Sequence, residues 1–140
     1  MASAVTFAQM VEAARRAVAG ISPQEVRRAG RENPRLIVIA DRDAADLDAT
    51  GVIPGTANIS LGSLAHKAEK DVPADWRDSR IQDRARPIIV TCDAGIMSAL
   101  GAKLLKDMGF QDVRYLEGGL DAWKRDGLPT EALTQRSLEV

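Results

Sequence analysis

Cysteine, histidine and aromatic residues are scarce in this chain. Its 140 residues include one cysteine, one histidine and only 4% aromatic residues. A single cysteine excludes an internal disulfide framework, a zinc finger and a four-cysteine iron–sulfur cluster. A single histidine, His66, excludes a metal site built from two or three histidines. Any soft nucleophilic chemistry must therefore fall on the single cysteine, Cys92.

An excess of charge of one sign and long apolar runs are missing as well. The chain has 19 basic and 20 acidic residues, so its near-neutral charge gives no reason to expect a nucleic-acid partner. No apolar run approaches the ~20 residues that a membrane span needs, and we expect no membrane partner. The N-terminus lacks the pattern of a signal peptide, and Glu12 disfavours an arginine-rich transit peptide. A lone thiol without an export signal favours a cytoplasmic location.

Apolar residues recur at helical spacing near the N-terminus, with charged residues between them. This pattern predicts an amphipathic helix over residues 7–19, within an N-terminal extension of residues 1–20. The helix could pack back on the domain or form a contact between two copies of the chain. We expect one domain over residues 21–130. A polar C-terminal tail, residues 131–140, is expected to be frayed.

Two short segments, residues 36–40 and 88–91, are apolar throughout and rich in β-branched residues. Such runs are typical of strands buried on both faces of a sheet. Further strands are expected at residues 57–61 and 112–116, and helices at residues 23–30, near residues 64 and 76, and at residues 98–108 and 120–125. The alternation predicts an α/β fold, a parallel sheet flanked by helices on both faces. Arginines and aspartates alternate over residues 75–86, which predicts a solvated face.

Cys92 follows directly after the apolar strand predicted at residues 88–91. Reactive groups collect at the carboxyl ends of parallel strands, and a helix is expected to begin at Ser98. Backbone N–H groups of residues 93–98 would then point at one spot and stabilise a thiolate or a persulfide on Cys92. Gly95 would let the backbone turn its amides inward. A cysteine after an apolar strand is equally consistent with simple core packing.

Four segments in the chain resemble motifs of the rhodanese-like (thiosulfate sulfurtransferase) family. They are Gly-Val-Ile-Pro-Gly-Thr-Ala-Asn-Ile at residues 51–59, Ile-Val-Thr-Cys-Asp-Ala-Gly-Ile-Met-Ser-Ala at 89–99, Lys-Leu-Leu-Lys-Asp-Met-Gly-Phe at 103–110 and Leu-Glu-Gly-Gly-Leu-Asp-Ala-Trp-Lys at 116–124. Ser-Pro-Gln-Glu at residues 22–25 is similar to the usual opening of the domain. The resemblance covers about residues 20–130 and implies a five-stranded parallel sheet between helices.

The resemblance also implies an activity, sulfur transfer through a persulfide. Cys92 would be the nucleophile that takes a sulfane sulfur from a small donor and passes it to a thiol or protein acceptor. The backbone amides of the active-site loop would surround the sulfur; these are the amides of Asp93, Ala94, Gly95, Ile96, Met97 and Ser98. The resemblance implies no metal and no organic cofactor.

The sequence departs from the family pattern near this loop. Met97 stands where the family has its loop arginine, and Asp93 adds a negative charge. We therefore expect a locally acidic loop that weakens the binding of a dianion such as thiosulfate. The Asp-Val-Arg of the family aligns with Ala-Asp-Arg at residues 40–42, so Arg42 and Asp41 are candidates for loop support. His66 matches no family residue and is expected to be a surface or capping residue.

Two other functions remain open at this stage. The first is a catalytically weak rhodanese-fold module that binds a partner or senses redox state, because an exposed, stabilised thiolate can be oxidised and reduced reversibly. The second is a phosphatase of the same fold. Phosphatases of this fold have a Cys-x5-Arg loop, and the chain has Ser98 at the position of that arginine. Without the arginine the phosphate oxygens lose their bidentate clamp.

Overall fold

A computed structural model describes residues 3–138 of the chain. The described elements are α1 (Phe7–Ala17), β1 (Gly20–Ile21), α2 (Pro23–Glu32), β2 (Ile37–Ala40), α3 (Ala44–Thr50), β3 (Ala57–Asn58), α4 (Leu61–Ala68), the short 3-10 helices η1 (Ala74–Trp76) and η2 (Ser79–Ile81), β4 (Ile88–Thr91), α5 (Met97–Asp107), β5 (Val113–Leu116), α6 (Gly119–Arg125) and α7 (Gln135–Leu138). No helix in this part of the chain is both long and apolar enough to cross a membrane.

The five strands form one parallel sheet in the order β1-β5-β4-β2-β3. The two apolar segments predicted as strands are the adjacent β2 and β4, in which Ala40 pairs with Thr91. Every residue of β4 is buried, as its β-branched and mostly apolar sequence predicts. The α/β fold and the five-stranded parallel sheet between helices are therefore confirmed.

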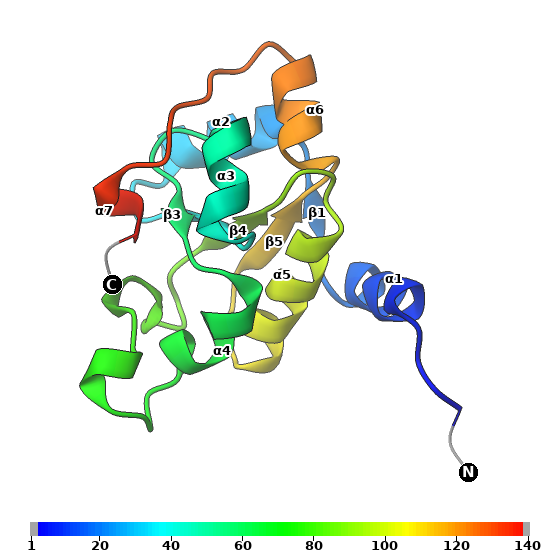
Figure 1. Cartoon of the computed structure of the whole chain (residues 1–140), viewed down its shortest axis with the longest axis vertical. Helices are drawn as coiled ribbons and strands as arrows, with labels where there is room; N and C mark the ends of the chain where they lie inside the picture. The colour runs from blue at the N-terminus through cyan, green and yellow to red at the C-terminus, as the bar shows by residue number, and fades with distance from the viewer. Residues whose placement is uncertain (1–2, 139–140) are drawn as a thin grey trace.

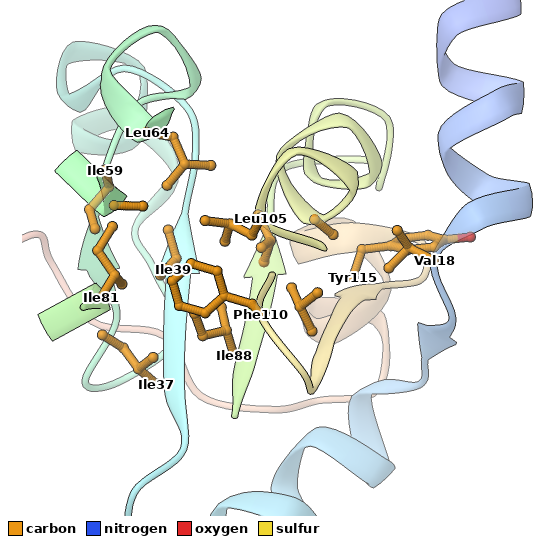
Figure 2. Packing of buried hydrophobic residues seen from close by; sticks show 14 of the residues in the cluster. Val18, Ile37, Ile39, Ile59, Leu64, Ile81, Ile88, Leu105, Phe110 and Tyr115 are labelled. Carbon is orange, nitrogen blue, oxygen red and sulfur yellow. The ribbon is translucent and has the colours of Figure 1, made fainter. Parts of the chain in front are cut away.

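Helices cover both faces of the sheet (Figure 1). On one face, α1, α4 and α5 pack over a cluster that includes Ile39, Leu64 and Leu105. Figure 2 shows these side chains meeting between the strands and the helices. On the other face, α2 and α6 enclose a second cluster around Ile89 and Trp123. The two clusters together fix β4, and with it the residue that follows the strand.

Some element boundaries differ from the sequence predictions. Strand β1 was not predicted, because two residues are too short to show an alternating pattern. The strand predicted at residues 57–61 ends at Asn58, since Leu61 already begins α4. The N-terminal helix is confirmed as α1, and it packs on α5 of its own chain, with Ala14 in the cluster that Leu105 shares.

The C-terminal segment is anchored at several of its residues, so the prediction of a frayed tail is wrong for them, although Leu138 is exposed. Glu131 forms an antiparallel bridge with Val52, and both of its backbone hydrogen bonds are made. Leu133 packs against the buried cluster of Ala40, Leu47 and Val52, and Ser137 is buried. A polar sequence does not exclude this packing, because backbone groups rather than apolar side chains make the bridge.

The segment predicted as a solvated arginine–aspartate face is partly buried, so that prediction is also wrong. Asp78 has no exposed surface and accepts hydrogen bonds from the backbone and guanidinium of Arg80. Arg84 donates to Met108 O and Ala68 O, the carbonyls that end α5 and α4. These arginines join an irregular segment to the helices around it.

Candidate active site

Cys92 lies at the carboxyl end of β4, in the loop that leads into α5. Its side chain is 5% exposed. The loop is anchored by α6, because Leu120 N donates to Cys92 O at 2.7 Å and Asp121 N donates to Asp93 O at 2.9 Å. A Cβ atom on Gly119 would come within 2.5 Å of the backbone of both loop residues, so only glycine permits this approach.

The Cys92 sulfur accepts backbone hydrogen bonds from two residues of its own loop. Gly95 N lies 3.1 Å from Sγ, and Ser98 N lies 3.3 Å from it. The hydroxyl of Ser98 is also 3.3 Å from Sγ, so the thiol donates to it and a thiolate would accept from it. Gly95 has a φ of +82°, in the left-handed region that favours glycine. Two backbone amides thus donate to the sulfur, and the Ser98 hydroxyl lies beside them within hydrogen-bonding distance.

The other predicted loop residues have different positions. Hydrogen bonds to the sulfur come, among the described residues, from Gly95 and Ser98 only, and not from the amides of Asp93, Ala94, Ile96 or Met97. Ala94 and Ile96 are exposed, and Met97 is the first residue of α5. The loop therefore presents an apolar side chain, Ile96, to solvent beside the buried sulfur.

Arg42 pairs with Asp93, which corrects the prediction of an acidic loop. The guanidinium Nη1 of Arg42 lies 2.5 Å from Asp93 Oδ1. The backbone of Arg42 is held in turn, because Asn58 donates to Arg42 O at 2.7 Å. The negative charge of the loop is therefore neutralised by a residue that follows β2.

A second arginine contacts the loop from outside the region of family resemblance. Arg15 of α1 donates to Gly95 O at 3.3 Å. No sequence pattern predicted this contact beyond the amphipathic pattern of α1. The contact depends on how α1 docks on α5, which a local pattern does not encode.

Asp41 is buried next to α5 and makes no hydrogen bond to the loop. It is 1% exposed, and neither carboxylate oxygen has a hydrogen-bond partner among the described residues. Gly101 leaves room for it, since a Cβ atom there would lie 2.5 Å from Asp41 Oδ2. Burial raises the pKa of Asp41 from 3.8 to about 7.

Little space lies beside the sulfur. A cavity of about 10 Å³ borders Cys92, Ala40, Leu47 and Leu120, and this is about the volume needed to hold one water molecule. A larger cavity of about 710 Å³ has Leu36, Arg80, Arg86 and Glu131 in its wall and does not include Cys92. Of these two cavities, the smaller one borders the Cys92 thiol.

No group of three or more His, Cys, Asp or Glu residues that could hold a metal occurs within residues 3–138. His66 is exposed on α4 and makes an edge-to-face contact with Trp76, with ring centroids 6.1 Å apart.

A model of the rhodanese-like domain family matches residues 22–126. The chain belongs to the rhodanese-like family. Within it, the chain is 36% identical over 90 residues to the thiosulfate sulfurtransferase GlpE of Pseudoalteromonas translucida, covering 63% of this chain and 73% of that protein. GlpE of Actinobacillus pleuropneumoniae is 43% identical over 49 residues, 35% of this chain and 45% of that protein. This rhodanese-like chain thus spans less than half the length of that relative.

Solved structures resemble the rhodanese-like chain beyond the family segment. A protein from Rhodopseudomonas palustris, described as a possible tyrosine phosphatase, has a TM-score of 0.82 and 25% identity, with 94% of this chain and 99% of that chain covered. The polysulfide-sulfur transferase homodimer of Wolinella succinogenes has a TM-score of 0.71 and 28% identity, with 92% and 89% covered. Because the first covers 94% of the chain, the similarity includes at least part of the segment before residue 22.

Proposed function

We propose that the protein is a sulfurtransferase that carries a sulfane sulfur as a persulfide on Cys92. The observation that carries this proposal is the surroundings of Sγ: Gly95 N and Ser98 N donate to it, and the Ser98 hydroxyl, which accepts from the thiol, would donate to a thiolate. These groups stabilise the thiolate that attacks, and they can stabilise the negative outer sulfur of a persulfide in the same way. Family membership and the thiosulfate sulfurtransferase relatives support the same reaction class.

The reaction has two balanced steps. In the first, the Cys92 thiolate attacks the outer sulfur of a donor such as thiosulfate, the donor S–S bond breaks, and sulfite leaves with the bonding electron pair. In the second, a thiolate acceptor attacks the outer sulfur of the Cys92 persulfide, and the Cys92 thiolate is released. No electron is gained or lost overall, and no cofactor is required.

The acceptor must be another molecule. Cys92 is the only cysteine in the chain, so a persulfide on it cannot collapse into an internal disulfide. We infer that an external thiol, either small or on a partner protein, removes the sulfur. The cytoplasmic location, the division into residues 1–20, 21–130 and 131–140, and a dimer contact through α1 stay predictions.

The donor is inferred to be a small sulfur anion. Thiosulfate and polysulfide, the donors named for a relative and a structural neighbour, are both anions. The pairing of Arg42 with Asp93 supports this inference, because it removes the charge repulsion that an unpaired Asp93 would impose.

A turnover assay with two donors and one thiol acceptor tests the proposal. Thiosulfate or polysulfide is mixed with the protein and dithiothreitol, and release of hydrogen sulfide is followed. We expect the wild type to accelerate release and Cys92→Ser to show only the background rate. Equal rates for the two proteins would overturn the proposal and favour a binding or redox-sensing module. Hydrolysis of an aryl phosphate that is lost in Cys92→Ser would favour a phosphatase instead.

A further inference from the structure

Helix α1 is firmly docked beside the Cys92 loop. It begins with a capping box between Thr6 and Gln9, and Ala14 is fully buried in the cluster that α5 also lines. Lys106 of α5 donates to Ala17 O at the other end of the helix. Figure 1 shows α1 lying alongside α5 at the edge of the molecule. This docking places Arg15 within hydrogen-bonding distance of Gly95 O.

The contact with Gly95 O acts on the Gly95–Ile96 peptide, which follows directly after one of the two amides that donate to sulfur. A trans peptide directs its C=O and its N–H in opposite directions. Holding Gly95 O toward α1 therefore turns Ile96 N–H away from the helix and fixes the orientation of this peptide. The same glycine donates to Cys92 Sγ through its own N–H. Arg15 thus restrains the loop at the residue where its conformation matters to the sulfur.

Arg15 also brings a positive charge that forms no ion pair within residues 3–138. Arg42 is paired with Asp93, and Arg16, the neighbour of Arg15, is paired with Glu12. The only hydrogen-bond partner of Arg15 among the described residues is the neutral carbonyl of Gly95. Through that residue its guanidinium lies at most about 10 Å from the Cys92 sulfur.

We propose that Arg15 is a positioning and specificity-determining residue, supplied by α1, that orients the Gly95–Ile96 peptide and favours anionic sulfur donors at Cys92. The inference rests on the proposed function for its substrate class. It assigns to the N-terminal helix the charge that Met97 does not supply within the loop. Helix α1 is then part of the active site rather than an appendage.

Competition between two alkylating reagents tests this without requiring sulfur transfer. Iodoacetate is an anion and iodoacetamide is neutral, and both report on the accessible Cys92 thiolate. We expect Arg15→Gln to lower the ratio of the iodoacetate rate constant to the iodoacetamide rate constant about two- to fourfold at low salt. In about 1 M salt the wild type and Arg15→Gln should give the same ratio. Arg15→Lys should keep the wild-type ratio, because it retains the charge.

Arg16→Gln is the matched control, since it makes the same charge change one residue further along α1. We expect it to leave the ratio unchanged. Equal ratios for Arg15→Gln and Arg16→Gln, or no alkylation of the folded wild type by either reagent, would overturn the inference.

Sulfur loading from thiosulfate is measured on the same proteins. We expect Arg15→Gln to raise the donor concentration needed for half-maximal loading. This fold-change should be several times larger than the fold-change in the maximal loading rate. A wild type that is alkylated but takes up no sulfur would contradict the proposed function, and the alkylation ratio would still decide the role of Arg15.

Discussion

Arginines gather at both ends of the parallel sheet, and their partners differ. At the amino end, Arg80 binds the fully buried Asp78, and Arg84 and Arg86 donate to backbone carbonyls. At the carboxyl end, Arg42 pairs with the half-exposed Asp93 in the Cys92 loop. One set therefore holds an irregular segment in place, whereas the other sets the charge around the Cys92 thiol. The residue type is the same, and the partners decide the role.

The largest effect is expected at the amino end. Asp78→Ala would leave Arg80 partly buried without its carboxylate, and we expect it to lower the free energy of unfolding by about 3–5 kcal/mol. Urea denaturation followed by circular dichroism measures this loss. A loss of less than about 1 kcal/mol in the free energy of unfolding is typical of an exposed ion pair, and it would contradict a structural role for Asp78 and Arg80.

A pH-dependent effect of similar size is expected at Asp41. Burial raises its pKa in the folded state to about 7, so the unfolded chain loses this proton first as pH rises. The contribution of Asp41 to the free energy of unfolding therefore falls by at most about 4 kcal/mol as pH rises from about 4 to about 7. Above about pH 7 this contribution no longer changes with pH. In Asp41→Asn this fall should be absent.

Urea denaturation at several pH values between about 4 and 8 compares Asp41→Asn with the wild type. The exposed Asp75 provides the control, and Asp75→Asn should keep the wild-type pH profile. Parallel profiles for the wild type and Asp41→Asn would show that Asp41 does not titrate in this range.

At the carboxyl end, substitution of Gly95 should affect the site more than stability. A Cβ atom there would lie 3.1 Å from Gly118 N and Leu116 O, in a backbone with φ +82°. We expect Gly95→Ala to cost about 1–2 kcal/mol of stability. Loading of Cys92 with sulfur should slow about tenfold, which corresponds to the loss of about one hydrogen bond.

Gly127→Ala is the control for the backbone cost alone. Gly127 has a φ of +73°, and no atom lies within 4 Å of the position of its Cβ. It should lose similar stability but load sulfur at the wild-type rate. Equal slowing in the two variants would mean that the Gly95 contact has no specific role.

The smallest effect is expected at Asp93. Its pair with Arg42 is 40% exposed on the aspartate side, so Asp93→Asn should change stability by less than about 1 kcal/mol. The freed charge of Arg42 should instead raise the rate of loading from thiosulfate about two- to fourfold at low salt. Stopped reactions analysed by mass spectrometry measure this rate. A slower rate would indicate that the pair orders the loop rather than setting its charge.

The sequence predicted the central strands and the position of Cys92 because these depend on local patterns. Continuous β-branched runs identified β2 and β4, and Cys92 follows β4 directly. The positive φ of Gly95 was also expected, because a glycine in this loop lets the backbone turn its amides inward.

Contacts between segments distant in sequence could not be predicted in the same way. The contact of Arg15 with Gly95 joins residues 80 positions apart, and the pair of Arg42 with Asp93 joins residues 51 positions apart. Each depends on how helices and strands dock. The alternation of charges over residues 75–86 was misread for the same reason, because burial of Asp78 is decided by the chain that covers it.

The mass of Cys92 after exposure to a sulfur donor tests the central claim most directly. Folded protein is incubated with thiosulfate or polysulfide, and the intact mass and the Cys92 peptide are measured before and after addition of dithiothreitol. The account predicts a gain of one sulfur atom on Cys92 that dithiothreitol removes and that Cys92→Ser lacks. A folded protein that gains no sulfur from either donor would contradict it.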